Sequence, residues 1–333
     1  MSSVVHVGLG KTATTTLQRH IFPLLAKRLG YHYNQPRLWD LLDKSTCVSL
    51  PSNEVEAVAQ ALRSERHFIS MEYLVSRDPA FWEQSAIRNL SLLGRETRIL
   101  ITLREPLEWM TSSYQQVVHF GNIIRPEDFF LPHDRHKLAV QLRGNTKSEY
   151  FCPDYLEFER LINFYRERFD HVCHVELSHI GKMDFIKTLF GINESFKKEL
   201  ECKFSSAPHE NRAYSSVAMS MTFQRERLLN IIGAKTMGSY DRRLDYYERR
   251  WSTGNSTITP YRELSDRDKL AQLPSRIVKR IAAHIYPGWE GFVRHRLDRI
   301  YPYQKYQLPP AVYLNQEKIE ASREFLRRTS VGA

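Results

Sequence analysis

The sequence predicts an α/β fold in which a mostly parallel central β-sheet is flanked by helices. Short runs rich in β-branched residues, at 3–8, 67–70, 98–103 and 171–177, alternate with stretches of helical periodicity. Apolar residues make up 42% of the chain and charged residues 26%, which is typical of globular proteins. The 333 residues are enough for one large α/β domain with insertions.

The first strand is followed by a glycine-containing turn and a helix from about Thr14 to Gly30, which Pro23 should kink. After the strand at 98–103, Pro106 is placed to begin a second helix and Gly121-Asn122 to end it. In the sequence, the first helix therefore follows the first turn directly, and the second helix closely follows the strand at 98–103.

The stretch at 121–153 is polar and contains prolines, which predicts a long loop that covers or contacts substrate. An amphipathic helix follows, because apolar residues recur at helical spacing: Phe158, Leu161, Ile162, Tyr165 and Phe169. A helix is expected at 183–190, and the pattern beyond Asn211 is mainly helical. We expect a single domain, 1–333, with a core to about residue 235 and a helical C-terminal extension from about 236.

Two motifs carry groups suited to binding phosphate. Gly8-Leu9-Gly10-Lys11-Thr12-Ala13-Thr14-Thr15-Thr16 follows the first strand. Backbone amides at the start of a helix, one lysine and several hydroxyls favour an anion there.

The second motif, Arg104-Glu105-Pro106, follows the strand at 98–103, and Ser112 lies eight residues after Arg104. An arginine and a hydroxyl can bind a second phosphate, which indicates a nucleotide with phosphates at both ends. The alternative for Arg104 is an ion pair with Glu105 or Glu108.

Gly10-Lys11-Thr12 also matches the end of the P-loop signature, so a nucleotide-dependent kinase is an alternative function. That signature places a glycine where this chain has Val5. A P-loop NTPase also needs a strand-ending aspartate for magnesium. The run at 98–103 is followed instead by Arg104, a cation.

These residues resemble the sulfotransferases that use 3′-phosphoadenosine 5′-phosphosulfate (PAPS). The loop of that family typically reads Lys-Thr-Gly-Thr-Thr, and here it reads Lys11-Thr12-Ala13-Thr14-Thr15. The 3′-phosphate motif of the family has arginine and serine eight residues apart, as Arg104 and Ser112 are. The resemblance covers about 4–18 and 67–120, with weaker agreement to about residue 230. It implies a P-loop-kinase-like fold, PAPS as co-substrate, adenosine 3′,5′-bisphosphate as product, and no metal.

The resemblance also implies roles for individual residues. Lys11 would stabilise the leaving phosphate oxygen, and Arg104 with Ser112 would hold the 3′-phosphate. The backbone amides of five residues would hold the 5′-phosphosulfate: Thr12, Ala13, Thr14, Thr15 and Thr16. The hydroxyls of Thr14 and Thr15 would add to them. Ala13 stands where glycine is usual, and we expect negative φ there.

The base that deprotonates the acceptor would be Glu72, which follows the strand at 67–70 as in glutamate-using carbohydrate sulfotransferases. His119 lies about two helical turns beyond Ser112 and is a candidate for the acceptor site. Arg212 is a candidate nucleotide contact. His6, within the first strand, is expected to be a hydrogen-bonded histidine on the sheet.

The formal net charge of +10 fits an anionic donor and an acidic acceptor. Together with the glutamate-type base that the resemblance implies, it favours a glycan or glycolipid as acceptor, with tyrosine residues, phenols, lipids and other small molecules as alternatives. Solvated helix faces explain the scattered arginine pairs equally well. A non-catalytic nucleic-acid-binding protein is a second alternative, although no known nucleic-acid-binding module is apparent. The four cysteines are widely separated, no apolar run approaches the ~20 residues that span a bilayer, and the first strand begins almost at Met1. We therefore expect a cytoplasmic protein with reduced thiols and no transmembrane segment.

Overall fold

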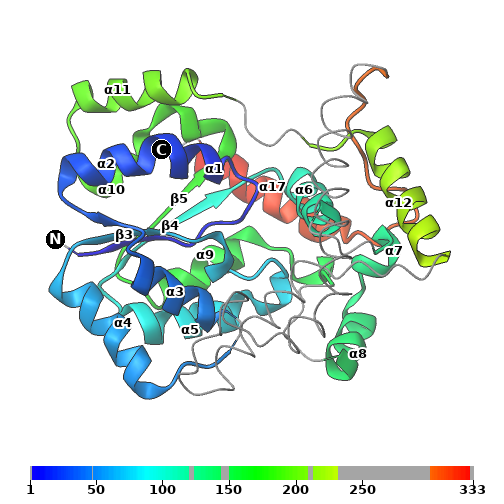
Figure 1. Ribbon diagram of the computed structural model, residues 1–333, viewed down its shortest axis with the longest axis horizontal. Coiled ribbons are helices and arrows are strands. Elements are labelled where there is room, and N and C mark those ends of the chain that lie inside the picture. Colours follow the sequence, from blue (N-terminus) through cyan, green and yellow to red (C-terminus); the bar gives the residue numbers. More distant parts are fainter. Residues whose placement is uncertain are drawn as a thin grey trace, which may run out of the picture. The chain divides into compact units, whose positions relative to one another are not determined.

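The computed structural model describes residues 2–46, 48–119, 124–143, 150–208, 213–231 and 301–330. In this part of the chain the fold is α/β, and the expected parallel sheet flanked by helices is confirmed (Figure 1). The sheet has five parallel strands in the order β2-β3-β1-β4-β5. The strands are β1 (Val4–His6), β2 (His32–Tyr33), β3 (His67–Ser70), β4 (Arg98–Leu103) and β5 (Val172–Glu176).

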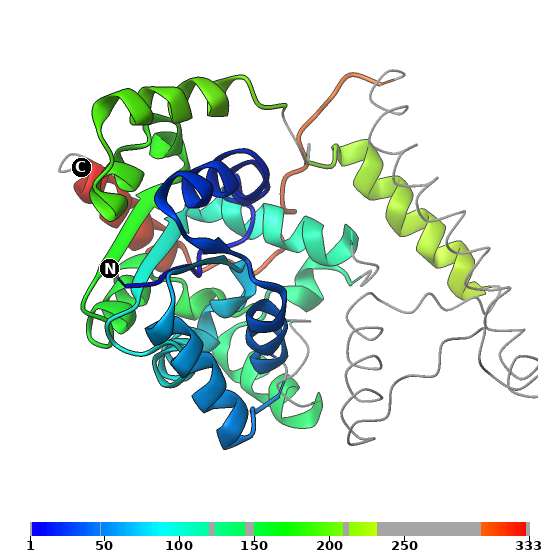
Figure 2. The ribbon, with the colours of Figure 1, turned by 60° about the vertical axis from the view of Figure 1, so that its left-hand side comes forward.

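Helices cover both faces of this sheet (Figures 1 and 2). One face carries α1 (Thr14–Thr16), the π-helical η1 (Leu17–Ile21), α2 (Phe22–Leu29), α10 (Asp184–Phe190) and α11 (Glu194–Ser205). The other face carries α3 (Pro36–Ser45), α4 (Ser52–Ser64), α5 (Trp82–Leu93) and α9 (Phe158–Arg166). Further helices are α6 (Pro106–His119), α7 (Pro126–Phe129), α8 (His133–Arg143), α12 (Ser216–Ile231) and α17 (Gln316–Ser330). Short 3₁₀ segments are η2 (Glu72–Leu74), η3 (Pro79–Phe81), η4 (Pro153–Tyr155) and η5 (Leu177–Lys182).

The chain divides into two compact units. The first comprises residues 1–114, 125–211 and 309–333, and it holds the sheet and α17. The second comprises residues 115–124 and 212–308. Within the second unit, Gln115 donates to the Tyr214 carbonyl at 3.1 Å and Ser215 forms an antiparallel bridge with Lys305. The expected boundary near residue 235 lies outside the described residues.

The central strands are apolar on both faces, as parallel strands between two helical layers must be. Val4 and Phe68 occupy matching positions on β1 and β3, and both are fully buried with Leu100 of β4 against η1 and α2. The intervening residues, such as Val5 and Ile69, are equally buried, and alternation along a strand directs them to the opposite face. This two-sided burial is why β1, β3 and β4 stand out in the sequence, whereas the short and more exposed β2 does not.

The first helix begins at Thr14 and ends at Leu29, with Gly30 in the left-handed conformation at φ 69°. The helix is irregular just before Pro23, where the segment η1 is π-helical. Proline lacks the N–H that an α-helix would use, and a π turn is one way for a helix to accommodate the missing bond.

The prediction of one long loop over 121–153 is wrong, because α7 and α8 lie within it. The sequence of α8 lacks an apolar stripe, and Leu138 and Leu142 are exposed. The helix is held instead by a polar contact: buried His136 meets buried Asp78 at 2.5 Å. Periodicity of apolar residues cannot reveal a helix that is docked in this way.

Gly8 packs too closely against β4 to accept a side chain. A Cβ atom there would lie 2.3 Å from Thr102 Oγ1, 2.5 Å from His6 Nε2 and 2.8 Å from the Thr102 backbone nitrogen.

We expect Gly8→Ala to lower the free energy of unfolding by at least about 2 kcal/mol, because the β1 backbone would have to move. Denaturant unfolding measures this. Gly181→Ala is the control, because its Cβ would meet only Phe204 at 3.7 Å. Equal losses in the two variants would contradict the prediction.

Candidate functional site

The two sequence motifs follow the carboxyl ends of the central strands β1 and β4. After β1 the chain turns to the side of the sheet that holds β2 and β3, whereas after β4 it continues to β5 on the other side. In open parallel sheets, ligands bind beside the carboxyl ends at the point where the connections diverge in this way. The β1 loop (residues 7–13) and Arg104 start from the two strands on either side of that point.

Arg104 joins the two predicted motifs directly. Its Nη1 atom donates to the backbone carbonyl of Lys11 and to Ser112 Oγ, both at 3.1 Å. The spacing of eight residues between Arg104 and Ser112 therefore brings the guanidinium and the hydroxyl together. The Arg104 side chain is 19% exposed, so its guanidinium is largely enclosed yet still reaches solvent.

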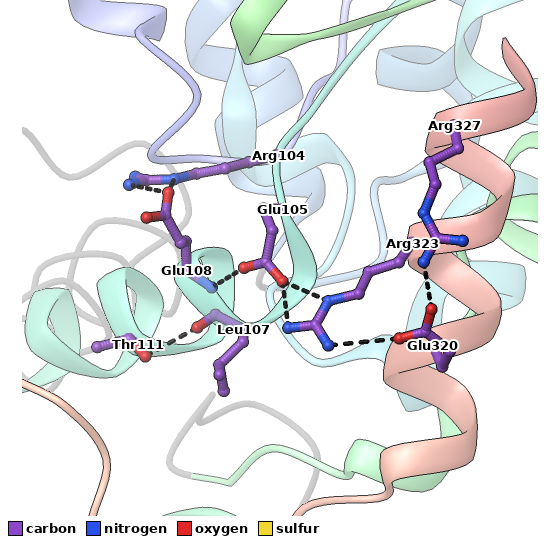
Figure 3. Close-up of polar contacts among 8 residues, drawn as sticks. All are labelled: Arg104, Glu105, Leu107, Glu108, Thr111, Glu320, Arg323 and Arg327. Atoms are coloured by element: carbon purple, nitrogen blue, oxygen red, sulfur yellow. Dashed lines mark hydrogen bonds and ion pairs between the residues drawn. The ribbon is translucent and has the colours of Figure 1, made fainter. Parts of the chain in front are cut away.

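The alternative predicted for Arg104, an ion pair with Glu108, is also present (Figure 3). Arg104 Nε and Nη2 donate to Glu108 Oε2 at 3.2 and 3.0 Å. Glu105 takes a different place: its Oε2 atom accepts from the Glu108 backbone N–H at 2.7 Å, and Oε1 accepts from Arg323. The guanidinium that would hold a phosphate is thus bound to a carboxylate of its own chain.

Beneath the β1 loop, a row of buried polar side chains crosses three strands. His6 lies between Ser70 on β3, at 2.8 Å from Nδ1, and Thr102 on β4, at 3.1 Å from Nε2. Burial lowers the pKa of His6 to about 3, so its imidazole is neutral at physiological pH. This confirms the expectation of a hydrogen-bonded histidine on the sheet.

The Leu9 carbonyl can only accept a hydrogen bond, and this determines the direction of the other hydrogen bonds in the row. The Thr12 hydroxyl donates to the Leu9 carbonyl at 2.6 Å, so Thr102 must donate to Thr12, which lies 2.6 Å away. Thr102 then accepts from His6 Nε2–H, and His6 Nδ1 accepts from Ser70. Ser70 Oγ accepts from Gln18 Nε2 at 3.0 Å, so each hydroxyl in the row donates once and accepts once.

The β1 loop adopts left-handed backbone conformations at two residues that are not glycine. Lys11 has φ 68° and Ala13 has φ 56°, so the expectation of negative φ at Ala13 is wrong. Two tertiary contacts hold the loop in this shape: the Thr12 hydroxyl bonds to Thr102, and the Trp109 indole N–H donates to the Gly10 carbonyl at 3.1 Å. The strain that results is of a kind that clusters at functional sites.

The threonines of this motif differ in what they offer an anion. Thr12 is fully buried, and its hydroxyl is used within the protein, so only its amide is suited to an anion. Thr14, Thr15 and Thr16 form α1, with Ala13 as the N-cap residue. The first N–H groups of a helix have no acceptor within it, which is the feature that the anion motif requires.

Glu72 lies close to the β1 loop, as the sequence predicts. It follows β3 directly and accepts a hydrogen bond from Thr14. Desolvation raises its pKa, while the Thr14 hydrogen bond and the charges of Lys11 and Arg77 act in the opposite direction. A carboxylate whose pKa is raised is a stronger base than one in water. Loops from β1 and β3 therefore bring a lysine, a hydroxyl and a carboxylate together.

Two further candidates lie at the edge of what the structure describes. His119 is the last residue of α6, and its side chain is not among those described. Arg212 lies outside the described residues. Within the described ranges, no three histidine, cysteine, aspartate or glutamate side chains gather as metal ligands would, and no helix is long and apolar enough to cross a bilayer.

Sequence reasoning missed several residues that shape this site. Ser70 and Thr102 were not singled out, although each is a polar residue that follows buried apolar residues in its strand and contacts His6. That interruption of the strand pattern could have identified them. Arg77 and Arg323 gave no comparable signal, because one lies in a loop and the other on a helix rich in arginine.

No model of a known protein family matches the chain, and no curated protein sequence matches it significantly.

Proposed function

We propose that this chain is a PAPS-dependent sulfotransferase with the P-loop-kinase-like fold of that family, which transfers a sulfuryl group to a hydroxyl or amine acceptor. One observation carries the proposal: the Arg104 guanidinium contacts both Ser112 and the backbone of Lys11. An adenosine with charged groups at its 3′ and 5′ positions needs two anion sites that are separate but adjacent. The Arg104–Ser112 pair and the β1 loop meet that requirement.

In the proposed complex, the amides at the start of α1 hold the 5′-phosphosulfate and the Lys11 amine lies at the bridging oxygen. Arg104 and Ser112 hold the 3′-phosphate. An arginine fork and a hydroxyl offer several donors in a fixed geometry, which suits a phosphate better than a single lysine would.

The proposed transfer is a direct displacement. The acceptor atom forms a bond to sulfur and gives its proton to Glu72, while the bond from sulfur to the bridging phosphate oxygen breaks. That oxygen gains negative charge as the bond breaks, so Lys11 stabilises the transition state more than the ground state. Adenosine 3′,5′-bisphosphate is the leaving product. Glu72 and Lys11 need to lie near each other for this reaction, and the effect of Lys11 on the Glu72 pKa indicates that they do.

A glycan or glycolipid remains the proposed acceptor class. Arg77 is a second cation near Glu72, and it also lies over the Tyr73 ring at 6.0 Å. A cation and an aromatic ring beside the proposed base suit an acceptor that carries an acidic group as well as a hydroxyl.

The inward-facing Thr12 hydroxyl favours this function over the kinase alternative. In P-loop NTPases the hydroxyl after the loop lysine is a magnesium ligand. Here that hydroxyl bonds to Leu9 and Thr102 and is fully buried.

The decisive experiment is incubation of the protein with radiolabelled PAPS and a panel of glycan, glycolipid and phenolic acceptors. Phosphate transfer from ATP with magnesium, and no sulfate transfer from PAPS to any acceptor, would overturn the proposal.

We expect Arg104→Ala to weaken binding of adenosine 3′,5′-bisphosphate at least about 30-fold, because a charge-assisted bidentate contact is lost. Binding of adenosine 5′-phosphate should change less than about 3-fold. Isothermal titration calorimetry measures both affinities. Arg95→Ala is the matched control, because Arg95 forms an exposed ion pair with Asp170 and should affect neither ligand. Equal losses for the two nucleotides on Arg104→Ala would count against the 3′-phosphate assignment.

Glu108→Gln should have the opposite effect on the same site. The Glu108 carboxylate competes with a phosphate for Arg104, and the amide that replaces it would compete less. We expect the affinity for adenosine 3′,5′-bisphosphate to rise about 3- to 10-fold, since the lost competitor is a partly exposed ion pair. Glu83→Gln, which removes the acid near Arg168, is the control. An unchanged or weaker affinity would show that Arg104 binds no phosphate or needs Glu108 to hold its position.

For Glu72→Gln, we expect turnover of PAPS to fall at least about 100-fold while the affinity for adenosine 3′,5′-bisphosphate stays within about 2-fold. The amide keeps the shape of the side chain but cannot accept the acceptor's proton. Turnover assays with labelled PAPS and calorimetry separate the two effects. Wild-type turnover in the variant would remove Glu72 from the mechanism.

The stability of the same variant tests the raised pKa of Glu72. The folded protein keeps the Glu72 proton to higher pH than the unfolded chain, whose reference pKa is 4.5. Stability of the wild type is therefore lost as the pH rises from 4.5 through the folded-state pKa, and Glu72→Gln escapes that loss. Thermal unfolding should show the variant gaining stability relative to the wild type as the pH rises above 4.5. A difference in stability between the variant and the wild type that does not change with pH would contradict the raised pKa of Glu72.

A further inference from the structure

The C-terminal helix α17 contacts the turn that carries Arg104. Arg323 on α17 donates to Glu105 Oε1 through Nε at 2.8 Å and lies 2.7 Å from the same oxygen through Nη2 (Figure 3). Glu105 is the residue between Arg104 and the start of α6. The two partners are 218 residues apart in the sequence.

Glu105 has a second role at the same place. Its other oxygen, Oε2, accepts from the Glu108 backbone N–H at 2.7 Å and so caps the first turn of α6. That turn carries Glu108 and leads to Ser112, the two side chains that contact Arg104. The orientation of the Glu105 carboxylate thus affects the positions of Glu108 and Ser112, which both contact Arg104.

Arg323 is in turn fixed on its own helix. Its Nη1 atom lies 3.4 Å from Glu320 Oε2, and Glu320 also pairs with Arg327. The three side chains form a row along α17 whose only described partner in the β4–α6 turn is Glu105. α17 itself packs against α9 and the 3₁₀ segment η4.

We infer that Arg323 is a positioning residue for the 3′-phosphate site, acting through Glu105 on Arg104 and the first turn of α6. This rests on the proposed function, because it assumes that Arg104 and Ser112 bind the 3′-phosphate. Arg323 holds the Glu105 carboxylate in the orientation that caps α6. The cap keeps Ser112 at the distance from Arg104 at which both can donate to one phosphate.

A purely structural role for this ion pair predicts something different. Arg323 and Glu105 are each about one third exposed, 35% and 34%, and such pairs contribute little to stability. Arg328 on the same helix forms a comparable pair with Glu159 of α9 at 2.8 Å, with side chains 56% and 48% exposed. If α17 merely anchors the fold, loss of either arginine should have the same consequence.

The test compares Arg323→Ala with Arg328→Ala in the full chain. We expect Arg323→Ala to weaken binding of adenosine 3′,5′-bisphosphate about 3- to 10-fold, with adenosine 5′-phosphate changed less than about 2-fold. Arg328→Ala should change neither affinity. The melting temperatures of both variants should stay within about 3 °C of the wild type. Equal effects of Arg323→Ala on the two nucleotides, or equal effects of the two variants, would overturn the inference.

A readout without nucleotide separates this inference from the proposed function. Hydrogen–deuterium exchange of the backbone amides at 107–112 should accelerate in Arg323→Ala and stay unchanged in Arg328→Ala. Glu105→Gln should reproduce the acceleration, and the double variant should add nothing to it, because both changes break one contact. If the wild type does not prefer the bisphosphate, the proposed function fails, yet exchange still reports on the cap. If exchange at 107–112 is unaltered, Arg323 does not position this turn.

Discussion

The site depends on the buried hydrogen-bonded row that crosses the sheet through Ser70, His6, Thr102 and Thr12. A buried polar group without a partner is costly, so the ends of β3, β1 and β4 can pack together only when every member of the row is paired. The neutral imidazole makes this possible, because one ring nitrogen accepts while the other donates. Gly8 lets the chain pass directly over this row. The loops that carry the candidate catalytic and binding groups thus start from fixed positions.

The hydrogen-bonded row fixes the ends of the strands, and Arg104 connects the loops that follow them. Its hydrogen bond to the Lys11 carbonyl ties the turn after β4 to the loop after β1, so the two proposed anion sites cannot move independently. Trp109 adds a second tie from α6 to the Gly10 carbonyl. Donors held in place before a ligand arrives need little reorganisation during a reaction, which is the main way in which proteins stabilise developing charge. The left-handed backbone at Lys11 and Ala13 is the conformational cost of holding the loop in this way.

The sequence was informative where local patterns decide the structure. Strands buried on both faces produce apolar runs, so β1, β3 and β4 could be predicted. The partly buried β5 could also be predicted, as could the adjacency of Arg104 and Ser112. The φ of Ala13 could not be predicted, because the contacts of Thr12 with Thr102 and of Trp109 with Gly10 determine it. Helix α8 escaped prediction because a buried His136–Asp78 pair replaces an apolar stripe. The contact of Arg323 with Glu105 depends on where a distant helix packs, which no local pattern records.

The charges around Arg104 decide what can select a ligand there. Arg104 and Arg323 face Glu108 and Glu105, so the two cations and two anions of this group balance. The net charge of +10 therefore does not create the proposed 3′-phosphate site, since the group itself carries no surplus. A phosphate would bind by replacing the Glu108 carboxylate at Arg104, and its advantage would come from a second contact with Ser112 that Glu108 is not seen to make. Selectivity at such a site follows from the geometry of the donors, and a ligand with no phosphate at that position would gain nothing by displacing Glu108.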